Sequence, residues 1–273
     1  MGANLNQIIA ATRRRVAEAR GSADLRALER QAGEHVPRGF RRQLAQRAES
    51  GVAIIAELKK ASPSKGLIRV DFQVRSLAKE LEAGGAAALS VLTDEEFFQG
   101  SLENLREASS ATQLPCLRKD FIVDEFQLLE ARAYSADAVL LIVAALSQAE
   151  LAAFGKRARE LGLDVLCEAH DEQELQRALD CGCDLIGINN RDLRTFKVDL
   201  ETAFRLAERF PRNVVRVAES GIQSGNDIAR LRAAGYHAFL IGESLMKSSS
   251  PNEALKSLIT EANREQSAVA TRR

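Results

Sequence analysis

The 273 residues of the chain suffice for one large domain or two small ones. Hydrophobic residues make up 45% of the chain and charged residues 28%, and 38 Lys and Arg balance 38 Asp and Glu, so the composition is that of a globular protein and indicates no nucleic-acid partner. No apolar run reaches the roughly 18 residues of a membrane helix, and the N-terminus has the wrong charge order for a secretory signal, so we expect a cytoplasmic protein without a membrane partner.

Residues 1–50 have the pattern of a polar, helical extension. Apolar positions such as Leu5, Ile8 and Val16 recur at helical spacing, and no strand pattern is present. Glycines near positions 21 and 33 divide this stretch into about three helices. We expect the extension to pack on the main body of the protein.

From residue 51 to 265, short apolar runs alternate with amphipathic segments. The expected strands lie at 52–58, 86–92, 114–117, 138–143, 164–168, 184–189, 214–219 and 237–241. The expected helices lie at 71–84, 101–111, 124–135, 147–161, 171–181, 199–209, 224–234 and 251–264. Residues 266–273 form a polar tail that we expect to be frayed.

This alternation predicts an α/β fold of the (β/α)8 TIM-barrel type, with an N-terminal helical extension. About eight strand–helix units fill about 220 residues, as in that barrel. The strands are mostly continuous apolar runs, which is typical of parallel strands covered on both faces. An open, doubly wound sheet is the alternative, and it is disfavoured because no Gly-x-Gly-x-x-Gly motif follows the first strand.

The first strand ends in two charged residues, Glu57 and Lys59. Residues two apart on a strand share a face, so both side chains leave a buried strand together. Charge there is costly unless it is paired or used. A structural ion pair and a catalytic pair are both open on this spacing alone.

Charged or polar residues close most of the other strands as well. Since barrel enzymes build their sites at the carboxyl ends of the strands, this regularity favours a catalytic rim over scattered ion pairs. By alternation, Lys119 shares the barrel interior with Leu117, while Arg118 points to the helices. Lys119 can then act as an acid toward a carbonyl or hydroxyl oxygen, with Glu168 as its base partner. The other residues at these ends are Thr93, Asn189, Arg191, Glu219 and Glu243.

The last two strand ends have the pattern of a phosphate site. Ser220-Gly221 precedes one helix, and Gly242-Glu243 begins another short one. Glycines let a backbone approach an anion, and helix N-termini direct N–H groups at it, although plain turns are the alternative. Glu243 fits such a site only if its side chain points away from the phosphate.

The cysteines and histidines give weaker signals. Of the four cysteines only Cys181 and Cys183 lie close together, and no second pair or histidine cluster has zinc spacing, so no metal site is expected. We interpret the cysteines as reduced thiols of a cytoplasmic protein. The histidines, of which His170 lies nearest a strand end, are expected in loops or in supporting positions.

Seven stretches together resemble the indole-3-glycerol phosphate synthase family, the tryptophan-pathway barrel enzymes. They span the whole predicted barrel, and the helical extension is similar too. The stretches are IIAELKKASPSKG (54–66), VLTDEEFFQGS (91–101), LRKDFIVDEFQ (117–127), LCEAH (166–170), IGINNRDL (186–193), AESGI (218–222) and LIGESLM (240–246).

The resemblance implies a lyase that acts on 1-(2-carboxyphenylamino)-1-deoxyribulose 5-phosphate, a small phosphorylated substrate. The enzyme closes a pyrrole ring with loss of carbon dioxide and water, and it needs no metal or organic cofactor. By analogy Lys119 is the acid of the ring closure and Glu168 is the base of the dehydration, helped by Lys59 or Glu57 as acid. Asn189 then holds a hydroxyl group of the substrate.

The resemblance also implies which residues hold the substrate. Phosphate binding falls to Lys59, Gly221, Gly242 and the backbone of Glu243. Phe98 and Phe121 wall the aromatic ring, Arg191 and Ser62 meet the carboxylate or order the first loop, and Glu219 and Ser220 complete the floor. The loop Ser62–Leu67 is expected to be a lid that closes over the substrate.

Two other functions are compatible with a phosphate-binding barrel. A sugar-phosphate isomerase, such as phosphoribosylanthranilate isomerase, would use a different acid–base pair, often Cys and Asp. A non-catalytic barrel that binds a phosphorylated metabolite would not require acid and base together. Lys119 and Glu168 on one rim therefore favour the synthase.

Overall fold

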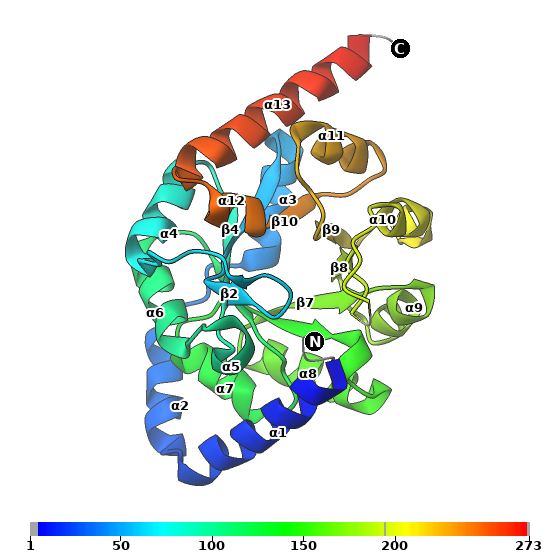
Figure 1. Ribbon diagram of the computed structural model, residues 1–273. Coiled ribbons are helices and arrows are strands. Elements are labelled where there is room, and N and C mark those ends of the chain that lie inside the picture. Colours follow the sequence, from blue (N-terminus) through cyan, green and yellow to red (C-terminus); the bar gives the residue numbers. More distant parts are fainter. Residues whose placement is uncertain (1–4, 194, 272–273) are drawn as a thin grey trace.

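The computed structural model describes residues 5–193 and 195–271 and has the predicted fold, a closed barrel of eight parallel strands ringed by helices (Figure 1). Around the barrel the strands follow chain order, and the last pairs with the first. The strands are β1 (Ala53–Leu58), β4 (Ala88–Leu92), β5 (Cys116–Lys119), β6 (Ala138–Ile142), β7 (Asp164–Ala169), β8 (Leu185–Asn189), β9 (Val215–Glu219) and β10 (Ala238–Ile241).

The expected helices follow the strands, each beginning or ending within a few residues of its predicted bounds. Several begin with a side-chain cap; Ser147 and Ser224, for example, each form a reciprocal capping box with the acidic residue three positions later. The helices of the barrel are α4 (Val74–Ala83), α6 (Leu102–Ala111), α7 (Phe126–Ala133), α8 (Gln148–Glu160), α9 (Glu172–Asp180), α10 (Glu201–Leu206), α11 (Gly225–Ala233) and α13 (Pro251–Thr271).

Short elements at the strand ends complete the barrel. A small antiparallel hairpin of β2 (Ala61–Ser62) and β3 (Gly66–Leu67) follows the first strand. The helices α5 (Glu95–Phe98) and α12 (Glu243–Lys247) follow β4 and β10, and 3-10 turns lie at Val143–Ala145 and Ala207–Arg209. The hairpin and α5 are too short for a periodic pattern to predict them.

Within the described residues, three helices precede the barrel and pack on its side and on the end opposite the cavity. They are α1 (Leu5–Ser22), α2 (Leu25–Glu34) and α3 (Phe40–Ser50). In Figure 1, α1 and α2 (blue) lie along one side of the barrel, where α2 packs on α7. Phe40 and Leu44 of α3 are completely buried among the residues that fill the barrel interior, so α3 closes the end opposite the rim.

The side chains of the strands divide between two cores. Leu117, Leu140 and Leu166 belong to the core inside the barrel, whereas Ile54 and Val139 belong to the core between strands and helices. Both groups are buried, as the continuous apolar runs predict for parallel strands. The interior is thus a packed floor beneath the rim.

Two features differ from the sequence-based expectations. The helix α13 continues to Thr271 instead of ending near residue 264, because no Gly or Pro interrupts the chain after Pro251.

The expectation of reduced thiols is wrong for Cys167 and Cys183, which form a disulfide, while Cys116 and Cys181 are free. The disulfide joins Cys167 on β7 to Cys183 in the turn before β8. The Cα atoms of the two cysteines lie 6.6 Å apart, a proximity that their separation of 16 positions along the chain does not reveal. Within the described residues, no helix is long and apolar enough to cross a membrane.

Candidate active site

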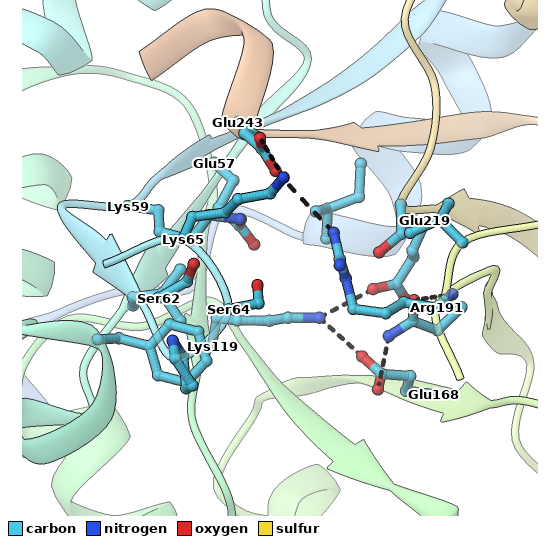
Figure 2. A pocket seen from close by; sticks show the side chains of 18 of the residues that line it. Glu57, Lys59, Ser62, Ser64, Lys65, Lys119, Glu168, Arg191, Glu219 and Glu243 are labelled. Carbon is cyan, nitrogen blue, oxygen red and sulfur yellow. Dashed lines mark hydrogen bonds and ion pairs between the residues drawn. The ribbon is translucent and has the colours of Figure 1, made fainter. Parts of the chain in front are cut away.

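A cavity of about 620 Å³ opens at the carboxyl ends of the strands, and we call it the central cavity. All the site residues expected from the sequence line it, although their roles remain predictions (Figure 2). These residues are Glu57, Lys59, Ser62, Phe98, Lys119, Phe121, Glu168, Asn189, Arg191, Glu219, Ser220, Gly221, Gly242 and Glu243.

Lys119 lies between two buried carboxylates at the base of the cavity. Its Nζ donates to Glu168 Oε2 and to Glu219 Oε2, each at 2.8 Å, as the dashed lines of Figure 2 show. Burial alone would lower the pKa of Lys119, but the two carboxylates outweigh it and hold that pKa well above its usual value. The ammonium therefore stays protonated, which is the form that a general acid requires.

Arg118, the neighbour of Lys119 on β5, points away from the cavity. Its guanidinium pairs with Asp120 at 2.9 Å and donates to the backbone of Gln127 on α7 at 2.6 Å. Strand alternation therefore separates a structural cation from the cation of the cavity, as the sequence predicts.

Glu168 is held ionised by three neighbours. Besides Lys119, Asn189 Nδ2 donates to Glu168 Oε1 at 3.1 Å, and His170 Nε2 lies 3.4 Å from the same oxygen. Burial would raise the pKa of Glu168, but Lys119 and His170 hold it well below its usual range. Glu168 is thus held in the ionised form that a general base requires.

The position of His170 is more specific than the loop or supporting position expected from the sequence. Its imidazole lies between Glu168 and Glu174, and Nδ1 is 2.9 Å from Glu174 Oε2. Burial lowers the pKa of His170, but the two carboxylates outweigh it and raise the pKa to about 10. A protonated His170 therefore supports the negative charge of Glu168.

Glu219 differs from Glu168 in its environment. It is 1% exposed, and its Oε1 has no hydrogen-bond partner among the described residues. Burial raises the pKa of Glu219 to about 7, with further raising by Glu168 and Glu57 and a lowering effect of Lys119. The two carboxylates on Lys119 thus differ in protonation near neutral pH.

Glu57 and Lys59 emerge together at the end of β1, as their spacing predicts, and they form an ion pair. Glu57 is 3% exposed, and Gly242 at the end of β10 packs on it. A Cβ at Gly242 would lie 2.6 Å from Glu57 Oε1, so this glycine leaves space for the carboxylate.

The loops after β9 and β10 have the backbone features of an anion site. Ser220 and Gly221 both have positive φ, at 63° and 83°, and a Cβ at Gly221 would lie 2.5 Å from Val198. The carboxylate of Glu243 turns toward Lys247, and it lies 4.0 Å from both Lys65 and Arg191. Three cations thus gather beside this end of the cavity.

The apolar end of the cavity is lined by residues that the sequence predicts and by two residues that it does not. Phe98 and Phe121 lie with ring centroids 6.3 Å apart. Leu5 and Ile8 of α1 also line the cavity. Their helical spacing predicts an apolar face, but nothing in the sequence indicates that this face reaches the rim.

Arg15 anchors α1 to the rim and is a second residue that the sequence does not single out. Its guanidinium lies 3.0 Å from Asp94 and 3.7 Å from Asp120, two carboxylates that are at most 4% exposed. The DEEFFQG loop and Lys119-Asp120 are visible in the sequence, but their partner lies 79 or more positions away.

Among residues 5–193 and 195–271, no three His, Cys, Asp or Glu side chains are arranged to hold a metal ion. The chemistry that the cavity offers is proton transfer. It holds a protonated lysine, an ionised glutamate and a glutamate that titrates near neutrality. One end of the cavity has the backbone features of an anion site, and the other end is apolar.

The chain matches the family model described as indole-3-glycerol phosphate synthase over residues 5–258. An indole-3-glycerol phosphate synthase from Koribacter versatilis is 60% identical over 259 residues, which cover 95% of this chain and all of that protein. One from Desulfotalea psychrophila is 51% identical, covering 81% of this chain and 85% of that protein.

Solved structures with similar folds are distant in sequence. A thiamine phosphate pyrophosphorylase from Pyrococcus furiosus superposes with a TM-score of 0.60 at 16% identity, covering 78% of this chain and 96% of that one. A lactate oxidase from Pediococcus acidilactici, described as putative in that function, gives a TM-score of 0.61 at 16% identity over 90% and 89% of the two chains. These likenesses concern the barrel alone.

Proposed function

The chain belongs to the indole-3-glycerol phosphate synthase family, and we propose that the residues around Lys119 carry out that family's reaction. The enzyme converts 1-(2-carboxyphenylamino)-1-deoxyribulose 5-phosphate to indole-3-glycerol phosphate with loss of carbon dioxide and water, as a carboxy-lyase of tryptophan biosynthesis. The reaction consists of a ring closure and a dehydration. Both stages need proton transfers, which positioned acids and bases supply without a metal or an organic cofactor.

Lys119 is the acid of the ring closure. In this step the aromatic carbon that carries the carboxylate bonds to the ketone carbon, and the ketone oxygen takes a proton from Nζ. Carbon dioxide then leaves, and the electrons of the broken bond return to the ring. Glu168 and Glu219 support this role because they keep Lys119 charged and fix Nζ at the base of the cavity.

Glu168 is the base of the dehydration. The new hydroxyl group takes a proton and leaves as water, while a proton is removed from the carbon beside the nitrogen to complete the pyrrole double bond. Lys59 or Glu57 supplies the proton to the leaving hydroxyl. Asn189, which donates to Glu168, holds a hydroxyl group of the substrate.

The remaining residues of the cavity hold the substrate at its two ends. The aromatic ring lies against the apolar end, where burial and ring contacts orient it, and the phosphate lies against the backbone of the last two loops. The ring is walled by Phe98 and Phe121, its carboxylate meets Arg191 and Ser62, the phosphate meets Lys59, Gly221, Gly242 and the backbone of Glu243, and Glu219 and Ser220 form the floor.

The single observation that carries this assignment is the position of Lys119 between Glu168 and Glu219. A protein that only binds a phosphorylated metabolite has no use for a protonated lysine beside an ionised base. A sugar-phosphate isomerase that uses Cys and Asp as its acid–base pair would not need a lysine held between two glutamates. Residues 51–265 form the catalytic barrel in this proposal, residues 1–50 the packed extension and residues 266–273 a polar tail.

The cellular location and the partners of the enzyme are also part of the proposal. The substrate is a small phosphorylated molecule, and we place the enzyme in the cytoplasm, where amino-acid biosynthesis takes place. The equal numbers of basic and acidic residues, 38 of each, give no field that would attract a nucleic acid.

The assignment is tested by following the fluorescence of the indole product. The chain contains no Trp, so the protein contributes no indole signal of its own. We expect turnover by the wild-type enzyme and a loss of at least about 1,000-fold in kcat for Lys119→Ala, with binding of the substrate retained. A Lys119→Ala enzyme with wild-type kcat would contradict the assignment.

A further inference from the structure

Gly187 lies directly beneath Glu219 in the barrel interior. It is on β8 two positions before Asn189, and the register pairs Asn189 with Glu219 on β9. Alternation therefore places Gly187 and Asn189 on the same face of β8, toward the central cavity. Gly187 on β8 and Glu219 on β9 therefore meet across two neighbouring strands.

The space beside Gly187 is occupied by the Glu219 carboxylate. A Cβ on Gly187 would lie 2.0 Å from Glu219 Oε1 and 3.0 Å from Cδ, both far inside van der Waals contact. The next atom, Leu166 Cδ1, would be at an ordinary 3.4 Å. Of the three atoms nearest to this Cβ, only the two of the Glu219 carboxylate lie too close for it.

Backbone conformation does not explain this glycine. Gly187 is not among the described glycines with positive φ, and it lies within a regular strand, where glycine is unfavourable. Glycine inside a strand often marks the close approach of another group. Here that group is one of the two carboxylates that hold Lys119.

We propose that Gly187 is a positioning residue for the reaction, because its missing side chain leaves the space in which the Glu219 carboxylate lies against Lys119. The inference rests on the proposed role of Lys119. A Cβ at position 187 displaces Glu219 Oε1, and the carboxylate must rotate away from the ammonium. Lys119 then loses one of its two acceptors, and Nζ shifts relative to the ketone oxygen.

The primary test is the kinetics of Gly187→Ala. We expect kcat to fall by about 100-fold, the cost of a misplacement of about 1 Å at the reacting centre, with KM changed by less than about threefold. Gly155→Ala is the matched control, because its Cβ meets only Arg159 Nη1, at 3.6 Å, on the outer helix α8. The control should retain wild-type kcat and KM. A Gly187→Ala enzyme with wild-type kcat would overturn the proposal.

A double-mutant cycle separates this role from a general packing defect. If Gly187 acts through Glu219 alone, Gly187→Ala costs nothing in a Glu219→Ala background, where the carboxylate is gone. Equal losses in both backgrounds would show that Gly187 acts elsewhere and would overturn the proposal. If Gly187→Ala alone fails to fold, the Tm decides: the double variant should regain the Tm of Glu219→Ala, and a double variant that also fails to fold contradicts the proposal.

The same experiments distinguish failure of this inference from failure of the assigned roles. An active wild type, an inactive Lys119→Ala and a fully active Gly187→Ala would overturn only the role of Gly187. A Lys119→Ala enzyme that retains wild-type kcat would overturn the roles around Lys119, whatever the Gly187 variant does.

Discussion

At the scale of single residues, the two carboxylates on Lys119 differ because their other neighbours differ. Glu168 also lies beside His170, and its pKa is held well below the usual range. Glu219 lies beside Gly187 and has an unpartnered oxygen among the described residues, and burial raises its pKa to about 7. Two residues of the same type thus have different protonation at neutral pH.

His170 is predicted to stabilise the folded protein in a pH-dependent way. The folded pKa of His170, about 10, lies above the usual 6.5 because Glu168 and Glu174 outweigh burial. Its contribution is therefore complete below about pH 6.5 and disappears as the pH rises through about 10. We expect His170→Asn to lower the free energy of unfolding by about 2 kcal/mol at pH 6, measured by urea titration.

The control for this prediction is the pH dependence itself. At pH 10.5 the unfolding free energies of His170→Asn and wild type should converge. His237→Asn is the matched control for this pH dependence. Burial and Arg216 lower the pKa of His237 and leave its imidazole neutral at pH 7, so its loss should not show the same dependence. A deficit of His170→Asn that is the same at pH 6 and pH 10.5 would show that the imidazole acts by packing rather than by charge.

At the scale of elements, α1 is a wall of the active site as well as part of the extension. Leu5 and Ile8 line the cavity, and Arg15 fixes the helix to Asp94 and Asp120. We expect Arg15→Ala to raise KM by about tenfold, equivalent to about 1.4 kcal/mol, with little change in kcat, because α1 lines the cavity but carries none of the residues assigned to the proton transfers. Steady-state kinetics measure both constants.

Arg20→Ala is the matched control on the same helix. Arg20 is 61% exposed and pairs with Asp124, whose side chain is 32% exposed, so its loss should change neither constant. An Arg15→Ala enzyme with the KM of Arg20→Ala would mean that α1 is held in place without Arg15.

The β2–β3 hairpin is predicted to be a lid that closes on the substrate. It carries Lys65, which is half exposed and lies 4.0 Å from Glu243 across the cavity end. We expect saturating indole-3-glycerol phosphate to slow tryptic cleavage after Lys65 by about tenfold or more, as a lid that orders over the ligand would. Peptide mass spectrometry measures cleavage at each site.

Cleavage after Lys156, which is exposed on α8, provides the internal control for the lid and should not change when the ligand is added. Equal rates at Lys65 with and without the ligand would argue against a lid.

The sequence predicts most of these elements because each strand and helix has a periodic pattern of its own. It also predicts which side chains meet at the rim, since parallel strands bring their carboxyl ends together. It does not predict Arg15 beside Asp94, the hairpin, or the space that Gly187 leaves for Glu219. Those features depend on contacts between distant segments or on elements too short to have a period.

At the scale of the whole molecule, the extension is fastened at both ends of the barrel. Arg15 binds at the rim, and His35 and Arg38 bind Asp137 before β6, at the closed end. Asp137 is fully buried and also accepts from the backbone of Cys116 at 2.7 Å. The barrel and the three helices should therefore unfold together.

Asp137→Asn tests this coupling. Burial would raise the pKa of Asp137, but hydrogen bonds from His35 and Arg38 outweigh it and hold that pKa below its usual 3.8. The contribution is thus present above about pH 4 and is lost as the pH falls through the folded pKa. We expect a loss of about 3 kcal/mol in the free energy of unfolding at pH 7, in one transition, by urea titration followed by circular dichroism.

The matched control is Asp124→Asn, which removes a partly exposed partner of α1. It should cost less than about 1 kcal/mol. Two separate unfolding transitions in Asp137→Asn, or a loss no larger than that of the control, would contradict the coupling between extension and barrel.

The separate roles of Lys119 as the acid and Glu168 as the base are tested most directly by a single-turnover experiment that follows two products of the reaction. Release of carbon dioxide reports the ring closure, and indole fluorescence, free of any Trp background, reports the dehydration. The account predicts that Lys119→Ala releases neither product at the wild-type rate, whereas Glu168→Gln releases carbon dioxide but forms indole at least about 100-fold more slowly. Carbon dioxide release by Lys119→Ala at the wild-type rate, or loss of both signals to the same extent in Glu168→Gln, would contradict it.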